Sequence, residues 1–391
     1  MCRPMKLIVN SFSPGRITMK KEARKITSPI LKRLNGNEDY FFRYQRIKEI
    51  STKVRVSEYL ITNACNIRCK GCWFFEYGFE KQTKDVNDLE KLRTFLRTER
   101  DRGINTSLII GGEPTLHPKR LGVFGEVMQF NSISTNGLKP LSLTDFPDFS
   151  VLISLFGGGP LDDELRAIRP SGKRFSDIFQ TSLDNYRHDP RAHFIFAVTE
   201  GGIQYIEETV QRIADNGNTV SVNFYSKYGT DHPLRTLHSS RLMNEILRVR
   251  SLYPSTLCSH PYYIKAMVTG KSHWGELGYD VCPSLSVDHP DNAARISNGN
   301  PVLPGFNAYA ADLETINLCC TSGHCEDCRD SQAVMSWIMI NQKQFVRDAN
   351  LLKTWIEIAE SYWHQFVWAH DFRNSTPSLM THNGINDIMT T

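Results

Sequence analysis

Short β-rich runs alternate with helical stretches from Val54 onward, and this alternation constrains the fold more than any other feature of the sequence. VRVSEYLIT comes first, and SLII, NSISTN, VLISLF, HFIFAVT and TVSVNFYS follow, each after a segment that can be helical. Strands separated by helices predict parallel βαβ units. About six such units are too few for a closed eightfold barrel. We therefore expect an α/β fold built on a partial (β/α)6 TIM-type barrel.

The remaining sequence divides the chain into four expected parts. Residues 1–53 form a basic extension of mixed character, and residues 54–240 hold the partial barrel. The pattern then changes to a Cys-rich region with helices over 241–370, and the Asn-, Thr- and Ser-rich residues 371–391 are expected to form a loosely ordered tail. In the barrel, DVNDLEKLRTFLRTERDRG has helical spacing, with Asp85 or Asn87 as the expected N-cap.

Composition narrows the class of protein. The net charge of +4 over 391 residues is small and does not predict a nucleic-acid partner. No apolar run reaches the eighteen or so residues that a bilayer span requires, so no membrane partner is expected. The start, MCRPMKLIVNSFSPGR, does not resemble a secretory signal, which favours a cytoplasmic location. In a reducing compartment, the ten cysteines favour metal binding or redox chemistry over disulfides.

Three of these cysteines lie together in ACNIRCKGCWFF, directly after the first expected strand. Cys65, Cys69 and Cys72 have the spacing C-x3-C-x2-C, whereas zinc sites normally close with four ligands. A [4Fe–4S] cube has four irons, each normally held by one thiolate. Three thiolates on one loop would leave one iron open to a ligand from outside. The loop therefore predicts an iron–sulfur site with an open position, and a zinc-binding module that is not an enzyme is the remote alternative.

The spacing resembles the signature of the radical S-adenosylmethionine (radical SAM) superfamily. In that family the open iron is chelated by the amino and carboxylate groups of SAM, and reductive cleavage of SAM gives a 5′-deoxyadenosyl radical that abstracts hydrogen from substrate. IIGGEPTLHP is similar to the family's GGEP motif, and ISTNG is similar to its third-strand motif. The resemblance implies that the SAM amino group lies along Gly111, Gly112 and Glu113, and that Thr135 and Asn136 face SAM.

The resemblance extends to the later strands. VLISLFG is similar to the fourth strand, which implies that Ser154 contacts the SAM carboxylate or ribose. Arg169 is the expected partner of that carboxylate, because Phe175 then falls where the family keeps an aromatic residue, and Arg166 is the alternative. Val198 and Tyr225 are candidates for the adenine pocket.

One position departs from the family. The residue before the third cysteine is usually aromatic, but here it is Gly71, and Trp73 and Phe74 follow the cysteine instead. This departure leaves open which ring covers the adenine.

Six cysteines fall after the expected barrel. Two separated cysteines followed by CxxC resemble the twitch type of auxiliary-cluster domain, related to the larger SPASM form. This implies a second [4Fe–4S] cluster on Cys258, Cys282, Cys325 and Cys328, in which Cys319 or Cys320 could replace one ligand. Structural zinc is the alternative.

The sequence predicts only the general class of the substrate and of the electron donor. The resemblance implies an electron donor of the ferredoxin or flavodoxin type. We favour a small biosynthetic substrate, and modification of a ribosomally made peptide is the alternative. No catalytic side chain is predicted.

Overall fold

The computed structural model describes residues 29–224, 237–269, 282–321 and 331–366. Within these ranges, eight strands form one sheet in the order β6-β5-β4-β3-β2-β1-β7-β8. The strands are β1 (Val56–Leu60), β2 (Thr106–Ile110), β3 (Phe130–Thr135), β4 (Phe149–Phe156), β5 (Ala192–Val198), β6 (Thr219–Phe224), β7 (Ala308–Tyr309) and β8 (Ile316–Asn317). Strands β1 to β6 are parallel to their neighbours. The mostly parallel sheet does not close, so the predicted α/β fold with a partial barrel is confirmed.

Helices connect most of the strands and form a separate bundle, but the segment between β3 and β4 contains no helix, so the helical segment expected there was wrong. The α-helices are α1 (Pro29–Arg33), α2 (Glu38–Lys53), α3 (Trp73–Glu76), α4 (Leu89–Asp101), α5 (Pro118–Val127), α6 (Pro160–Arg166), α7 (Ile178–Asn185), α8 (Ile206–Asp215), α10 (Ser239–Leu252), α11 (Pro261–Thr269), α13 (Ala293–Ser297), α14 (Ser331–Ile340), α15 (Gln342–Phe345) and α16 (Ala349–Phe366). The 3₁₀ segments among the described residues are η1 (Phe79–Lys81), η2 (Pro114–Leu116), η3 (Glu200–Tyr205) and η4 (Pro290–Asn292).

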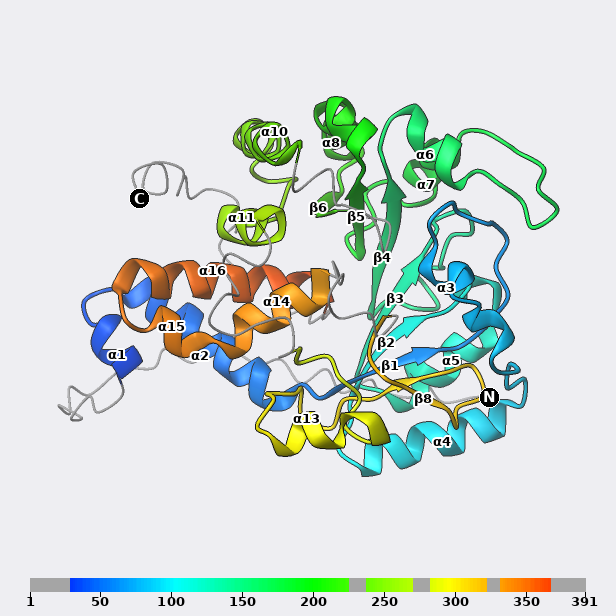
Figure 1. Cartoon of the computed structure of the whole chain (residues 1–391), viewed down its shortest axis with the longest axis horizontal. Coiled ribbons are helices and arrows are strands. Elements are labelled where there is room, and N and C mark those ends of the chain that lie inside the picture. The colour runs from blue at the N-terminus through cyan, green and yellow to red at the C-terminus, as the bar shows by residue number, and fades with distance from the viewer. Residues whose placement is uncertain (1–28, 225–236, 270–281, 322–330, 367–391) are drawn as a thin grey trace, which may run out of the picture.

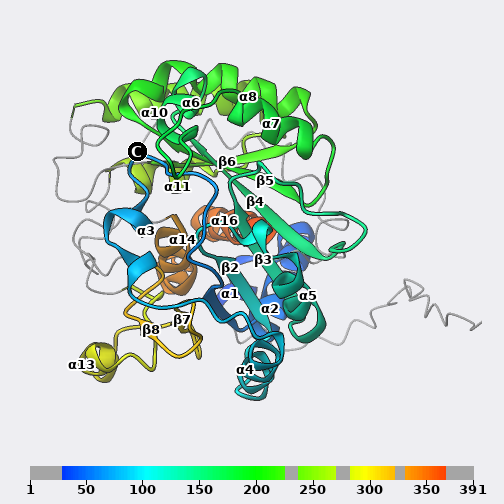
Figure 2. The ribbon, with the colours of Figure 1, turned by 90° about the vertical axis from the view of Figure 1, so that its right-hand side faces the viewer.

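The sheet separates two groups of helices. Helices α4 to α8 lie along one side of the sheet, and α2, α14 and α16 form a bundle on the other (Figures 1 and 2). The side toward α4 and α5 is apolar, since Tyr59 packs edge-on against Phe95 and Phe124. The C-terminal end of α16, red in Figure 1, meets the sheet at β4.

Helix α4 begins after both of the expected N-cap residues. Asp88 is its N-cap, and its side chain accepts hydrogen bonds from the backbone N–H groups of Glu90 and Lys91. The predicted caps, Asp85 and Asn87, were therefore wrong. The Asp85 carboxylate instead binds the segment that follows β1, where Thr62 and Asn63 donate to it.

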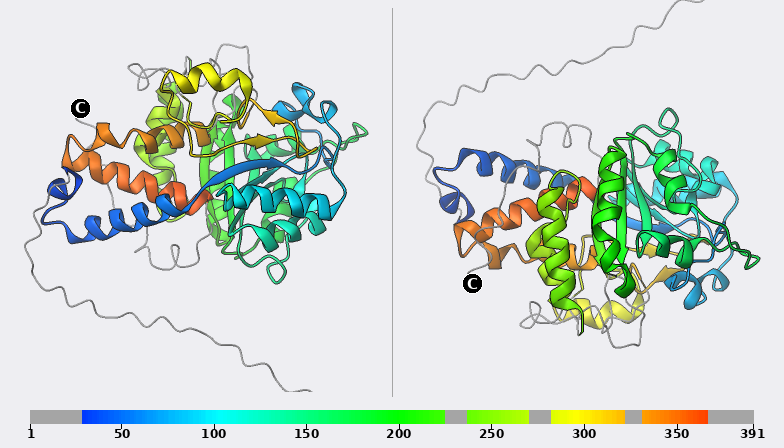
Figure 3. Two further views of the ribbon diagram at one scale, coloured as in Figure 1. Left: turned by 90° about the horizontal axis from the view of Figure 1, so that it is seen from below. Right: turned by 90° about the horizontal axis from the view of Figure 1, so that it is seen from above.

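The N-terminal residues that the structure describes are more ordered than a basic extension implies. Helix α2 lies against α16 (Figure 3). Arg43 forms a 2.5 Å ion pair with the buried Glu360, and the Tyr40 hydroxyl donates to Glu357. Burial alone would raise the pKa of Glu357, but hydrogen bonds from His260 and Tyr40 lower it to about 2. An ion pair and a hydrogen bond therefore hold residues of the expected extension to the C-terminal helix.

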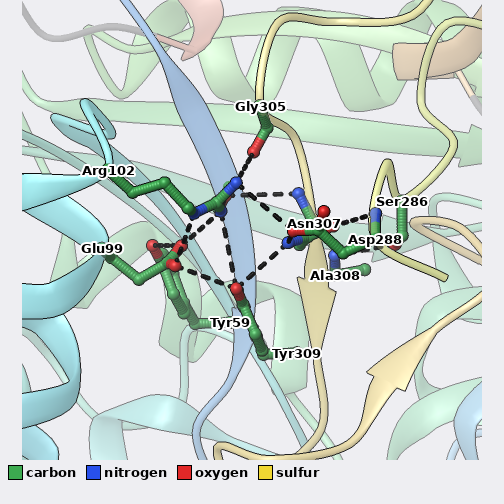
Figure 4. A network of polar contacts seen from close by, with 10 residues as sticks. Tyr59, Glu99, Arg102, Ser286, Asp288, Gly305, Asn307, Ala308 and Tyr309 are labelled. Carbon is green, nitrogen blue, oxygen red and sulfur yellow. Dashed lines mark hydrogen bonds and ion pairs between the residues drawn. The ribbon is translucent and has the colours of Figure 1, made fainter.

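A polar network joins β7 to the barrel (Figure 4). The Glu99 carboxylate on α4 accepts hydrogen bonds from the hydroxyls of Tyr309, at 2.9 Å, and Tyr59, at 3.1 Å. Arg102 donates to Glu99 at 2.9 Å and to the carbonyl of Gly305 at 2.7 Å. Strand β7 also pairs in parallel with β1. The main sheet thus crosses the predicted domain boundary at residue 240, and the four-part division stays a prediction.

Candidate iron–sulfur and SAM site

The cysteine loop begins where β1 ends and finishes at α3. Cys72 is the N-cap residue of α3, so the three sulfurs lie between the carboxyl end of a strand and the start of a helix. Asp85 fixes the entry to the loop, because Thr62 Oγ1 donates to it at 2.6 Å and the Asn63 N–H donates at 2.8 Å. Active sites of parallel barrels lie at this edge of the sheet.

Two glycines after β2 lie directly against the entry to this loop. The Gly112 N–H donates to the Thr62 carbonyl, and the Glu113 N–H donates to the Ala64 carbonyl, both at 2.8 Å. A Cβ on Gly112 would lie 2.2 Å from the Ala64 oxygen, and one on Gly111 would lie 2.7 Å from the Thr62 oxygen. The glycine pair is therefore required by close backbone packing against the loop.

The Glu113 carboxylate joins the predicted second- and third-strand motifs. Glu113 is 1% exposed and accepts hydrogen bonds from Thr115, from Thr135 Oγ1 at 2.8 Å and from the Asn136 N–H at 2.7 Å. The Asn136 side chain in turn donates to Asn66 Oδ1 in the cysteine loop at 2.7 Å. Residues predicted from two motifs thus meet beside the loop. That these residues contact SAM stays a prediction.

Arg166, the alternative predicted arginine, lies beside the second cysteine. Its side chain is 1% exposed, pairs with the fully buried Asp162 at 3.1 Å and donates to the Ser154 carbonyl. Burial raises the pKa of the Cys69 thiol, and the Arg166 guanidinium opposes that rise. Asp162 was missed in the sequence, although its i, i+4 spacing to Arg166 on one helix was a usable signal.

Arg169, the preferred arginine, is placed differently. It is exposed, on a turn in which Ile168 and Arg174 form an isolated bridge, and its guanidinium lies 4.2 Å from the centre of the Phe175 ring. Phe175 packs against the same buried cluster, Ile67, Ala167 and Ile178, as Cys65 and Cys69 do. The Arg169–Phe175 pair is therefore near the cysteine loop, and a role for Arg169 toward the SAM carboxylate stays a prediction.

The other predicted SAM contacts are on the later strands. Ser154 is half-buried on β4, and Val198 is fully buried as the last residue of β5, paired in register with Phe224. Tyr225 lies outside the described residues.

Gly71 explains the family departure in the loop. Its φ is +75°, in the left-handed region that favours glycine, so an aromatic side chain there would strain the backbone. Trp73, Phe74 and Phe79 instead pack together after the third cysteine.

The chemistry of the loop fits an iron–sulfur cluster. Burial, with a smaller contribution from the nearby Cys69, raises the pKa of Cys65 to about 11 and that of Cys72 to about 12. Neighbouring thiols with raised pKa values do not lose their protons readily. They become thiolate ligands when a cation binds to them. Arg166 Nε is also buried and makes no hydrogen bond to nitrogen or oxygen. A buried donor of this kind, next to the Cys69 thiol, suits a sulfur-rich anionic group.

The C-terminal cysteines that the structure describes lie in two separate regions of the fold. Cys258 follows a bridge to β6, since Leu257 pairs with Val220. Cys282 precedes a segment that pairs with the residues after β8, where Leu285 bridges Cys319 and the Cys320 N–H donates to the Ser284 carbonyl. Cys325 and Cys328 lie outside the described residues. The auxiliary cluster stays a prediction.

Comparison with known proteins decides the family. The family model described as "Radical SAM superfamily" matches residues 59–235, which contain the cysteine loop and its companion motifs. The chain contains a radical SAM superfamily domain. As radical SAM enzymes bind a [4Fe–4S] cluster and SAM, the family implies both cofactors.

Two curated relatives are named GTP 3′,8-cyclase. The protein from Alkaliphilus metalliredigens is 29% identical over 143 residues, which are 36% of this chain and 40% of the relative. The protein from Alkaliphilus oremlandii is 27% identical over 153 residues, covering 39% and 43%. The radical SAM chain thus matches less than half the length of either relative.

Solved structures that resemble this chain are more distant in sequence. A histidine-tagged form of anSMEcpe with bound AdoMet is 11% identical, with a TM-score of 0.45, and the match covers 83% of this chain and 97% of the other. SuiB of Streptococcus suis, bound to precursor peptide SuiA, is 16% identical, with a TM-score of 0.39 and coverage of 55% and 51%. In the part of this radical SAM chain that the structure describes, the helices are all too short or too polar to cross a bilayer.

The buried pair at the site gives a first prediction for the radical SAM domain. Arg166→Gln should lower the free energy of unfolding by about 3–5 kcal/mol, because it leaves the Asp162 carboxylate buried without its cation. Chemical denaturation of the anaerobic protein measures this change. The double variant Asp162→Asn/Arg166→Gln should recover part of the loss, since neither charge is then left alone. Equal stability of Arg166→Gln and the parent chain would contradict the prediction.

Proposed function

We propose that this radical SAM enzyme binds a [4Fe–4S] cluster through Cys65, Cys69 and Cys72 and acts on a small biosynthetic substrate. The observation that carries the proposal is the partly buried three-cysteine loop, with the buried Arg166 guanidinium beside Cys69. When bound and reduced by an external donor, the cluster would supply one electron to SAM, and cleavage of a carbon–sulfur bond would then give methionine and the 5′-deoxyadenosyl radical that takes hydrogen from the substrate.

The residues of the chain position these groups. Asp85 and the Gly111–Gly112 pair hold the loop at the carboxyl edge of the sheet. The Glu113 carboxylate keeps the ends of β2 and β3 together, and the open backbone of the glycines can face the SAM amino group. Arg166 supports thiolate character at Cys69, and Arg169 is the proposed partner of the SAM carboxylate. Ser154, Val198 and Tyr225 complete the proposed SAM contacts.

The substrate class rests on the names of the relatives. Both act, by name, on GTP, which is a small molecule, although each matches this chain over less than half its length. GTP is therefore the first compound to test. Modification of a ribosomally made peptide remains the alternative. A ferredoxin or flavodoxin is the proposed source of electrons.

We also propose an auxiliary cluster, with one of its predicted ligands changed. The pairing of residues 284–285 with Cys319 and Cys320 brings the segments of Cys282 and these two cysteines side by side. We assign the ligands to Cys282, Cys325 and Cys328, with Cys319 or Cys320 replacing Cys258.

One experiment tests the function. The chain is purified and reconstituted without oxygen, its iron and sulfide are counted, and 5′-deoxyadenosine is measured after addition of SAM and dithionite, with and without GTP. About four irons per chain indicate the SAM cluster alone, and about eight indicate the auxiliary cluster as well. Faster 5′-deoxyadenosine formation with GTP supports the nucleotide substrate. A colourless protein that leaves SAM intact would overturn the proposal.

A further inference from the structure

A second group of metal-binding side chains lies away from the cysteine loop. His193, Cys258 and His364 place one ligand atom each within 4.8 Å of one another. They come from three elements far apart in sequence, namely β5, the segment bridged to β6, and α16. No local pattern in the sequence indicates this group, because isolated histidines are usually satisfied polar residues.

The chemistry of the three side chains suits a divalent ion of borderline softness. Imidazole nitrogen and thiolate sulfur are the ligands that Zn²⁺ prefers, and a site with three protein ligands keeps a fourth position for water or another donor. Each side chain comes from a different part of the chain, so the fold, not a local motif, brings them together. We propose that His193, Cys258 and His364 bind Zn²⁺ and that this ion ties the end of α16 to the β5–β6 edge of the sheet.

The surroundings hold these ligands in place. His193 is fully buried, with Nδ1 2.7 Å from Thr219 Oγ1 and Nε2 2.9 Å from Ser221 Oγ. On metal binding, one ring nitrogen of His193 would keep its hydrogen bond to a hydroxyl, which orients the imidazole. The other ring nitrogen would lose its hydrogen bond and bind the ion. Ser361, one turn before His364, donates to the Cys258 carbonyl at 3.2 Å. This bond fixes α16 beside the thiol.

A cation also lies near the cysteine. Arg250 Nε donates to the Ser259 carbonyl at 2.8 Å, and the Arg250 guanidinium interacts electrostatically with Cys258. Thiolate is the form that binds metal.

The proposed zinc site is distinct from the SAM site. His193 is the second residue of β5 and pairs with Thr219, the first residue of β6, so it lies at the amino edge of the sheet. The cysteine loop follows the carboxyl end of β1. The length of β5 alone separates the two edges by about 15 Å. The zinc proposal takes Cys258, which the sequence predicted as an auxiliary-cluster ligand, and uses none of the cysteines that the proposed function assigns to either cluster.

Metal content tests the site directly. The full-length chain is purified without oxygen, and zinc, iron and sulfide are measured in the parent chain and in Cys258→Ser and His364→Ala. We expect about one zinc per chain in the parent and an affinity for Zn²⁺ at least about tenfold lower in each variant, with iron unchanged. Cys2→Ser and His238→Ala are the matched controls and should retain zinc. His238 pairs with Glu200 at the surface.

Cobalt provides a second measurement that does not depend on the variants folding. Adding Co²⁺ to the zinc-depleted parent chain should give the visible bands of a tetrahedral ion and a thiolate-to-cobalt charge-transfer band, and thermal unfolding should shift to higher temperature on Zn²⁺ addition. Absence of both the zinc and the charge-transfer band overturns the proposal. Loss of about four irons in Cys258→Ser also overturns it, because Cys258 would then belong to an iron–sulfur cluster. Neither result affects the test of SAM cleavage.

Discussion

Replacing Cys65, Cys69 and Cys72 together with alanine is expected to abolish release of 5′-deoxyadenosine from SAM. The reason is that the loop supplies every protein ligand proposed for the SAM cluster, and each thiol lies where burial disfavours the free thiolate. Iron should fall by about four per chain, and the brown colour of that cluster should disappear with it. Iron counting, visible absorption and the 5′-deoxyadenosine assay measure these effects.

The controls separate the SAM cluster from the rest of the chain. Cys2→Ser, which removes a cysteine at the other end of the sequence, should keep full activity. Any auxiliary cluster should survive the triple substitution, so about four irons would remain in a chain that began with about eight. A triple variant that still converts SAM to 5′-deoxyadenosine would place the cluster elsewhere and remove the basis of the proposed function.

The core of the fold could be predicted because its signals in the sequence are local. Most of the six parallel strands are compact β-rich runs next to helical stretches, so their positions could be read without knowing their neighbours, although no helix lies between β3 and β4. The cysteine loop was visible for the same reason, since its three thiols lie within eight residues.

Features that depend on distant contacts could not be predicted. Strand β7 has only two residues, Ala308 and Tyr309, and becomes a strand because it pairs with β1 and joins the Glu99 network. Two-residue strands carry no periodicity. The N-terminal helices were likewise missed as a packed unit, because the partners of Arg43 and Tyr40 are more than three hundred residues away on α16.

The choice between two arginines shows that residue spacing does not predict burial. Arg169 was preferred from its spacing to Phe175, and the structure does place the two side chains together. However, burial could not be read from that spacing, and it is Arg166 that lies inside, with Asp162, next to Cys69. Both arginines therefore deserve separate substitutions.

The second large effect is expected from a single methyl group. In Gly112→Ala the new Cβ would lie 2.2 Å from the Ala64 oxygen and 2.5 Å from its carbonyl carbon. Both atoms belong to the backbone, so no side-chain rotation can relieve the contact. The segment entering the cysteine loop must move, and a displacement of about 1 Å at such a site can lower a rate about 100-fold.

The measurement compares two alanine substitutions of glycine in the same chain. Gly122 lies in α5, and a Cβ there would meet no atom within 4 Å, so Gly122→Ala should keep activity and gain up to about 1 kcal/mol in helix stability. Gly112→Ala should instead bind less iron and form 5′-deoxyadenosine far more slowly. If both variants behave like the parent chain, close contact between the glycine pair and the loop entry does not control the site. A loss confined to Gly112→Ala would show that the position of the cysteine loop depends on the absence of that one methyl group, because both substitutions add the same atoms to the chain.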